Sequence, residues 1–204
     1  MGNIMGKTYA NKSKQVKRLG AEVSQLSVPF SVRATQRVST TYVVDLWDTL
    51  ENLSDVEELL FVLGVAEEQD RIIIHLNCLG GSAYVGDAVM LAMNNCAAEI
   101  HVQASGIVAS FATFILLACS SFEISPFCEV LCHSASFSAY GKMGETKQQA
   151  EFVYKQCEKM IRHYYEGFLT ENEIVRIIEQ GYEHRMTAEE FVERFKNMVE
   201  QYLL

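Results

Sequence analysis

The sequence predicts an α/β fold of stacked βαβ units, in which parallel strands alternate with crossover helices. Residues 71–76 form a continuous apolar run, which is typical of a parallel strand buried in a sheet. Apolar residues then recur at helical spacing over 85–93, and a second strand pattern follows over 99–104. The order of strand, turn and helix repeats over 99–119, so two such units lie next to each other in the chain.

The chain before these units divides into an arm and a first strand and helix. Residues 1–39 are polar and rich in Lys, Ser and Thr, so we expect a flexible basic arm followed by one domain over 40–204. Residues 41–47 are β-branched and aromatic and predict a strand. Ser54 with Glu57 three residues later matches a capping box and predicts the start of a helix.

The second half of the chain predicts a short strand and several helices. A strand is expected over 129–133, followed by a loop or extended arm over 134–144 that is small, polar and glycine-bearing. Apolar residues then mark one face of a long helix over 150–168. The last helices are predicted at two capping boxes, Thr170 with Glu173 and Thr187 with Glu190.

Charge and cysteine usage exclude several classes of function. With 17 basic and 26 acidic residues the formal net charge is -9, whereas a general nucleic-acid binder needs a basic surface or patch. The basic cluster in the arm is more often a solvated terminus than a contact with nucleic acid or an acidic partner. The six cysteines show no paired spacing, so no zinc site, disulfide framework or other cofactor site is predicted.

The sequence also predicts a cytoplasmic protein without membrane contact. Its start lacks the long apolar run of a secretory signal. The most apolar stretch, 100–117, is interrupted by polar side chains that would be costly in lipid. We interpret that stretch as a buried strand followed by a buried helix.

Ser110 is the strongest candidate for a reactive side chain. It lies where a strand has ended and a helix of small residues begins. Taken alone, an ordinary N-cap serine is the commoner explanation, because Ser is a preferred cap residue. The Gly80–Gly81 turn is also a weak signal, since neither glycine-rich phosphate motif is present, although a backbone N–H at such a turn can stabilise an oxyanion.

Several segments together resemble the proteolytic subunit of Clp protease, the ClpP family, which has a crotonase-like fold with a protruding handle helix. They are residues 77–92, 106–117, 129–133 and 186–190. In that family an Asn-Ser-Pro-Gly-Gly turn supplies an oxyanion-hole amide, Ala-Ser-Met-Gly carries the nucleophile, and a His at a strand end is the base. The corresponding residues are Asn77-Cys78-Leu79-Gly80-Gly81, Ala109-Ser110-Phe111-Ala112 and His133.

The resemblance implies acyl transfer by a serine, a histidine and an acid. Ser110 is expected to attack a peptide carbonyl with His133 as its base, while the backbone N–H groups of Gly81 and Phe111 form the oxyanion hole. Counting back from Met186 places Glu179 where the family has its catalytic Asp.

Three departures from the family pattern bear on this assignment. Glu183 is an alternative acid, and either glutamate is equally well explained as a solvated charge at a helix end. Phe111 stands where the family has Met, and we expect its ring to narrow the pocket near the scissile bond. The stretch from Ser110 to His133 is two residues shorter than usual, which a deletion in a surface turn explains.

The resemblance also implies substrates and partners. Unfolded polypeptides are expected to bind as an added strand, and the residues assigned to that site are Ser82, Ala83, Ala135, Ser136 and Phe137. The family forms homo-oligomeric rings, heptamers doubled into tetradecamers, that stack through the handle. An ATPase unfoldase is a partner in the family, but the terminal segments that dock it are altered here.

Two other functions remain open. A catalytically inactive ring subunit with a scaffold or regulatory role is favoured by the changed acid and the changed motif flanks. A crotonase-type acyl-CoA enzyme would use paired backbone amides but would not need the pair of Ser110 and His133. The sequence therefore predicts a serine endopeptidase first, a scaffold second and an acyl-CoA enzyme third.

Overall fold

A computed structural model describes residues 38–202, and residues 1–37 of the predicted arm lie outside that range. The elements, in chain order, are β1 (Thr41–Leu50), η2 (Leu53–Val56), α2 (Glu57–Val65), β2 (Arg71–Gly81), α3 (Ala83–Asn95), β3 (Glu99–Ala109), α4 (Ala112–Ala118), β4 (Ser121–Ile124), β5 (Glu129–Cys132), α5 (Met143–Tyr165), α6 (Glu171–Gln180), β6 (His184–Met186) and α7 (Ala188–Tyr202).

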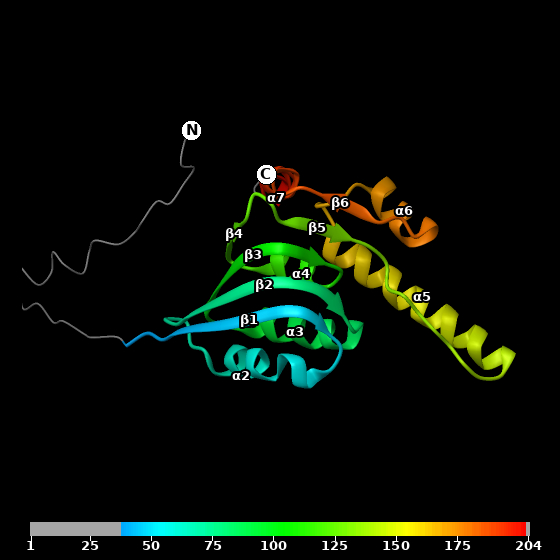
Figure 1. Ribbon diagram of the computed structural model, residues 1–204, viewed down its shortest axis with the longest axis horizontal. Helices are drawn as coiled ribbons and strands as arrows, with labels where there is room; N and C mark the ends of the chain where they lie inside the picture. The colour runs from blue at the N-terminus through cyan, green and yellow to red at the C-terminus, as the bar shows by residue number, and fades with distance from the viewer. Residues whose placement is uncertain (1–37, 203–204) are drawn as a thin grey trace, which may run out of the picture. The chain divides into compact units, whose positions relative to one another are not determined.

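A six-stranded sheet forms the centre of the described region (Figure 1). Its strand order is β1-β2-β3-β5-β6, and β4 pairs with β3 beside β5. The pairs β1–β2, β2–β3, β3–β4 and β3–β5 are parallel, and β5–β6 is antiparallel. The α/β prediction, with helices connecting parallel strands, is therefore confirmed.

The core lies between this sheet and the helices α2, α3 and α4, which run along one of its faces (Figure 1). Alternate residues of β2, from Ile72 to Cys78, are fully buried because they point into this layer, whereas Ile73 and His75 on the other face are half-buried. β1 is an edge strand, and only Leu46 and Leu50 of its residues are buried. The helix layer thus supplies most of the apolar burial of the sheet.

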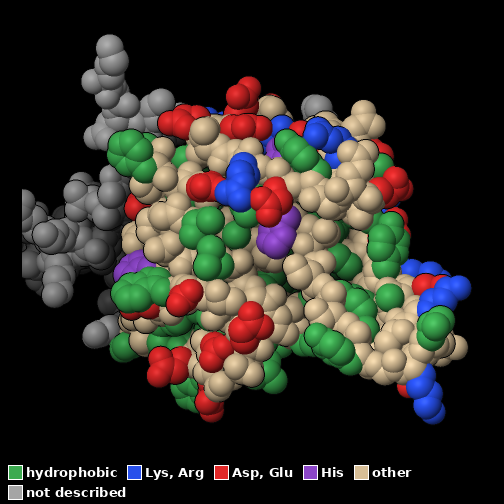
Figure 2. All heavy atoms as spheres, turned by 45° about the vertical axis from the view of Figure 1, so that its right-hand side comes forward, with side chains coloured by type: hydrophobic (Ala, Val, Ile, Leu, Met, Phe, Trp, Pro, Cys, Tyr) green, Lys and Arg blue, Asp and Glu red, His purple; other side chains and the backbone are tan. Residues whose placement is uncertain are grey.

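α5 leaves the sheet as a long projecting helix, with the segment after β5 running beside it (Figure 1). Its 23 residues span about 34 Å at 1.5 Å per residue. Only Ile161 and Tyr165, near its C-terminal end, are buried. Figure 2 shows basic and apolar side chains together at the projecting end of this face, where Tyr140 and Met143 are almost fully exposed.

A smaller aromatic cluster joins the last helices to the sheet. The Phe122 ring of β4 packs edge-on against Phe191 and Phe195 of α7, with centroids 5.5 and 5.0 Å away. Phe168, just after α5, contacts Phe191 at 5.2 Å. The chain after α5 is therefore anchored to β4 by aromatic packing.

Local signals predicted some helix starts and missed others. Thr170 caps α6 as predicted, because its side chain accepts from the Glu173 N–H. The start predicted at Ser54 is wrong. There the Asp55 carboxylate accepts from the N–H groups of Glu51 and Asn52, at 2.9 and 2.8 Å, so the helical turn begins after Asn52.

None of the helices described is long and apolar enough to cross a membrane. The apolar stretch over 100–117 forms most of β3 and α4, which confirms its interpretation as a buried strand followed by a buried helix.

Candidate active site

The carboxyl ends of three adjacent strands bring the candidate residues to one edge of the sheet. β2 ends at Gly80–Gly81, β3 leads into Ser110, and β5 leads into His133. Ala109 pairs with Leu131 across the parallel β3 and β5, so these two ends lie level with each other. In open α/β sheets this edge is where ligands bind, because the loops that follow the strands surround a crevice there.

Ser110 occupies a strained turn between β3 and α4. Its φ is 57°, in the left-handed region that non-glycine residues rarely adopt, at a cost of about 1–3 kcal/mol. Its N–H donates to the Leu131 carbonyl at 2.9 Å, and its carbonyl accepts from the Thr113 N–H at 3.0 Å. The N-cap position of α4 is Phe111 rather than Ser110, and no side chain caps that helix. The ordinary capping explanation for Ser110 is therefore wrong.

Gly80 packs directly against the Ser110 side chain. Its φ is 89°, and a Cβ added there would lie 2.5 Å from Ser110 Cβ and 3.1 Å from Ser110 Oγ. The same Cβ would lie 2.9 Å from the Ala109 carbonyl oxygen. Only glycine fits this contact, so the glycine turn and the serine turn are built as neighbours.

The Phe111 amide is available to bind an anion. Among the residues described, no acceptor is found for its N–H, whereas the neighbouring amides of Ser110 and Thr113 both donate. The Phe111 ring is 3% exposed and packs on Gly86 of α3, where an added Cβ would lie 2.8 Å from the ring. The expectation that this ring narrows the substrate pocket is wrong, because Gly86 leaves room for it in the core.

His133 is half-buried and follows β5 directly. Within the described residues no hydrogen bond joins its ring to Ser110. Hydrogen bonds between a nucleophile and its base are often long before substrate binds, so the missing contact does not exclude His133 as a base.

The two candidate acids lie in different places. Cys132 pairs with His184 in the antiparallel β5–β6 ladder, and continuing that register by one residue sets His133 opposite Glu183. A hydrogen bond from Arg185 at 2.7 Å lowers the pKa of Glu183, and the charge of His133 lowers it further. Glu179 is exposed in the last turn of α6, and among the described residues no hydrogen bond or ion pair joins it to His133.

The predicted substrate residues lie on both sides of this edge. Ser82 precedes α3 and donates its N–H to the Leu50 carbonyl at 3.0 Å, and Ala83 is the first residue of that helix. Ala135, Ser136 and Phe137 belong to an exposed segment without regular hydrogen bonds. A pocket of about 220 Å³ separates this segment from α5, where Ala150, Val153, Tyr154 and Cys157 line it.

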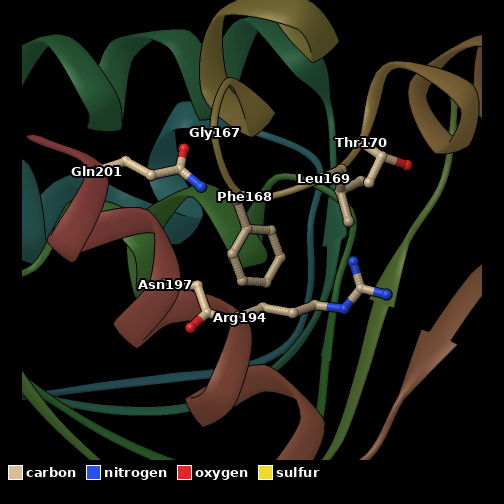
Figure 3. A pocket seen from close by; sticks show the side chains of 7 residues that line it. All are labelled: Gly167, Phe168, Leu169, Thr170, Arg194, Asn197 and Gln201. Carbon is tan, nitrogen blue, oxygen red and sulfur yellow. The ribbon is translucent and has the colours of Figure 1, made fainter.

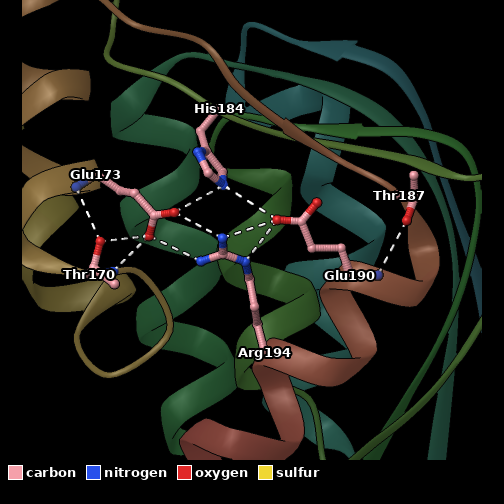
Figure 4. A network of polar contacts seen from close by, with 6 residues as sticks. All are labelled: Thr170, Glu173, His184, Thr187, Glu190 and Arg194. Carbon is pink, nitrogen blue, oxygen red and sulfur yellow. Dashed lines mark hydrogen bonds and ion pairs between the residues drawn. The ribbon is translucent and has the colours of Figure 1, made fainter.

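A network of charged residues around His184 was not predicted from the sequence (Figure 4). Arg194 of α7 donates to both carboxylate oxygens of Glu173, at 3.0 and 2.8 Å, and to Glu190 at 3.0 Å. His184 is 8% exposed, with Nε2 3.7 Å from Glu173 and 4.0 Å from Glu190. The two glutamates were recognised only as capping residues, and their spacing gave no sign of a shared arginine.

This network perturbs the ionisation of its members. Burial alone would raise the pKa of Glu173, but hydrogen bonds from Arg194 and Thr170 outweigh it and lower that pKa to about 2. Burial lowers the pKa of His184, because removal from water disfavours the charged imidazolium, and the charge of Glu173 opposes this only in part. His184 therefore stays neutral beside an ionised Glu173.

A second pocket, of about 350 Å³, opens between the α5–α6 turn and α7 (Figure 3). It is lined by Phe168, Leu169 and Thr170 of the turn and by Arg194, Asn197 and Gln201 of α7. The guanidinium group of Arg194 already binds Glu173 and Glu190, so it is not free to bind an anionic ligand in this pocket.

The described residues contain no cluster of His, Cys, Asp or Glu that suits a metal ion. All six cysteines are free thiols. Burial raises the pKa of Cys119 and of Cys132 to about 12, so these thiols stay protonated at neutral pH.

The family model described as Clp protease matches residues 34–194. The ATP-dependent Clp protease proteolytic subunit 1 of Shouchella clausii (strain KSM-K16) is 30% identical over 122 residues. That match covers 59% of this chain and 62% of the relative, so the chain spans somewhat less than two thirds of the relative's length.

Proposed function

Because the chain belongs to the Clp protease family, we propose that it is a serine endopeptidase whose nucleophile is Ser110. The observation that carries this proposal is the strained Ser110 turn, which sits against Gly80 at the sheet edge where β5 delivers His133. Ser110 adopts a left-handed conformation without capping its helix, and residues strained in this way cluster at active sites.

The proposed reaction is acyl transfer to water. Ser110 Oγ attacks the peptide carbonyl and gives its proton to His133, which passes it to the leaving amine. The N–H groups of Gly81 and Phe111 hold the oxyanion, and the unpartnered Phe111 amide supports that role. Water activated by His133 then hydrolyses the acyl-enzyme, and this proposed mechanism uses no cofactor.

We assign the acid of the triad to Glu183 in preference to Glu179. Support comes from the β5–β6 register, which sets Glu183 opposite His133, and from the effect of His133 on the Glu183 pKa. Arg185 holds the carboxylate from one side, while a carboxylate on the imidazole would fix its tautomer and stabilise the imidazolium. Glutamate thus takes the place of the usual aspartate.

The substrates we propose are extended, unfolded polypeptides. The segment 135–137 lacks regular hydrogen bonds and is exposed, so its backbone groups are free to pair with a peptide strand alongside Ser82 and Ala83. Family membership and the exposed apolar residues along α5 support assembly into a cytoplasmic homo-oligomeric ring, a heptamer or a double ring. The name of the relative, an ATP-dependent protease subunit, supports a partner ATPase.

One observation favours a second function, that of an inactive ring subunit. Ser110 and His133 share no hydrogen bond within the described residues, and the triad acid departs from aspartate. Both functions predict the same fold and the same assembly, so activity at Ser110 separates them.

The test is labelling of the full chain with a fluorophosphonate probe, which reacts only with activated serines. We expect wild-type protein to label at Ser110, with loss of labelling in Ser110→Ala and His133→Ala, since general-base assistance contributes about 100- to 10,000-fold. Native mass of the same samples shows whether the variants assemble like wild type. Assembled wild-type protein that resists labelling would establish the inactive subunit instead.

A further inference from the structure

Two side chains behind the Ser110 turn form a chain of hydroxyl groups that ends on the carbonyl of Ser110. Thr113 Oγ1 donates to Ser110 O at 2.6 Å, and the Tyr165 hydroxyl lies 2.7 Å from Thr113 Oγ1. Thr113 has a single hydroxyl proton and gives it to Ser110, so Tyr165 is the donor to Thr113. Both hydrogen bonds therefore run in one direction, toward the nucleophile.

Burial strengthens this chain of hydrogen bonds from Tyr165 through Thr113 to Ser110, called the relay below. Thr113 and Tyr165 are both 0% exposed, and hydrogen bonds in series strengthen one another where water is excluded. Burial also raises the pKa of Tyr165 well above its ordinary value, so the phenol keeps the proton that it donates. A buried hydroxyl left without its partner would destabilise the turn, so each member depends on the other.

The relay acts on the one backbone group of Ser110 that β5 does not reach. The Ser110 N–H is bound by Leu131, whereas its carbonyl accepts from Thr113 twice, through the backbone N–H and through Oγ1. A residue at φ 57° keeps that conformation only if its surroundings hold both peptide groups. Thr113 thus completes the restraint on the strained turn.

Tyr165 connects this restraint to the projecting helix. It is the last residue of α5, and its ring packs edge-on against Phe114 of α4 with centroids 5.1 Å apart. One tyrosine therefore joins the end of α5 to the helix that follows the nucleophile turn.

We infer that Thr113 and Tyr165 are positioning residues that hold the Ser110 turn in its left-handed conformation and thereby set the reactivity of Ser110 from the end of α5. The part that concerns reactivity rests on the proposed function. The part that concerns conformation does not, and the two parts are measured separately.

The experiment compares Tyr165→Phe and Thr113→Val with wild type in the full chain. Thr113→Ser retains the hydroxyl and serves as the conservative rescue. Tyr164→Phe is the matched control, because Tyr164 also packs on Phe114 but has no hydrogen bond to Thr113. The readouts are the rate of fluorophosphonate labelling at Ser110 and hydrogen exchange of the amides over 110–118, with α3 as the internal reference.

We expect Tyr165→Phe and Thr113→Val to slow labelling about 10- to 100-fold, the range for a small misplacement of a reacting group. Exchange over 110–118 should accelerate while exchange in α3 stays unchanged, and Thr113→Ser and Tyr164→Phe should behave like wild type. If Thr113→Val fails to fold, Tyr165→Phe carries the comparison alone, because it removes one oxygen and keeps the ring.

A folded Tyr165→Phe variant that labels and exchanges like wild type overturns the inference. If wild-type protein is not labelled at all, the proposed function fails. Hydrogen exchange alone then tests whether Tyr165 holds the conformation of the Ser110 turn. Faster exchange in Tyr165→Phe then supports the conformational role, and unchanged exchange refutes it.

Discussion

The nucleophile and the acid of the proposed triad are held in place by different kinds of structure. Ser110 is restrained by backbone hydrogen bonds and by the close approach of Gly80, which leaves no room for a Cβ beside the serine side chain. Glu183 is half-exposed and precedes β6, a strand of three residues. Charged residues of α6 and α7 surround that strand.

The two parts should tolerate different changes in conditions. Packing and backbone hydrogen bonds depend little on pH or salt, so we expect the nucleophile turn to persist wherever the domain is folded. Ion pairs depend on both, so the position of the acid should respond to pH and ionic strength. Four variants test this division, from the largest expected effect to the smallest.

Glu183→Gln should lower kcat for a fluorogenic peptide by roughly 1,000- to 10,000-fold, the loss expected when a triad histidine loses its carboxylate. KM should change little, because the carboxylate acts on His133 rather than on the substrate. Glu179→Gln is the matched control and should retain wild-type kinetics. If Glu179→Gln lost activity and Glu183→Gln did not, the acid of the triad would be Glu179 in α6. The acid would then not belong to the short strand region that is contrasted here with the Ser110 turn.

Gly80→Ala should destabilise the domain by about 2–4 kcal/mol, because the added Cβ combines a strained φ with overpacking against Ser110. Labelling at Ser110 should fall as well, since the methyl group displaces the serine side chain. Chemical denaturation measures the first effect and probe labelling the second.

Gly64→Ala is the control for that substitution. Gly64 lies in α2 with nothing within 4 Å of an added Cβ, so alanine should stabilise the protein by about 0.5–1 kcal/mol. A mild effect of Gly80→Ala would show that the turn relaxes more easily than its packing suggests.

Acid should destabilise the region around Glu173 before it affects the nucleophile turn. The pKa of Glu173 is 4.5 unperturbed and about 2 when folded, so its stabilisation is full above pH 4.5 and is lost as the pH falls toward 2. After allowance for solvent screening we expect about 2 kcal/mol, visible as a steep fall in unfolding free energy. Glu173→Gln should lower stability at pH 7 and flatten that fall.

His184 adds to the same trend. Its pKa is lowered by burial, so protonation below its unfolded value of 6.5 favours the unfolded chain and stability falls with pH. A pH profile of Glu173→Gln that matched wild type would show that the ion pairs do not control stability.

Thr170→Ala should cost about 1 kcal/mol, because it removes the cap that accepts from the Glu173 N–H. Ser54→Ala is the control, since η2 begins without a cap from Ser54. Its unfolding free energy should match that of wild type. Equal losses in the two variants would mean that capping boxes can be recognised from sequence alone.

The long elements were predictable because their apolar periodicity is strong enough to identify each one by itself. β2 and α3 lie where the pattern placed them, although β2 and β3 run further than predicted, to Gly81 and Ala109. β4 and β6, of four and three residues, were not predicted. Segments this short show hardly any period, so β5, also of four residues, was predicted while β4 was not, and hydrogen bonds to neighbouring strands fix all three as strands.

The short length of some strands also limited how much of the candidate site could be predicted. Ser110 and His133 follow strands that the pattern recognised, but only the resemblance to the ClpP family implied that the two residues act together. The acid depends on β6 and on its register with β5, neither of which the pattern revealed. The helix start predicted at Ser54 shows a similar failure, because the Asp55 carboxylate accepts from the N–H groups of Glu51 and Asn52 and the turn begins before Ser54.

The change of neighbour along β3 gives the site freedom to tolerate insertions and deletions. Residues 101–104 of β3 pair with β4, and residues 107–109 pair with β5. Gly106 lies between them, and on the other side of β3 the next residue, Ile107, donates its N–H to the Asn77 side chain at 3.0 Å, where the β2–β3 ladder is irregular. The connection over 125–128 can therefore lengthen or shorten without shifting either ladder. A change in the length of that connection would leave Ser110 and His133 at the same edge of the sheet.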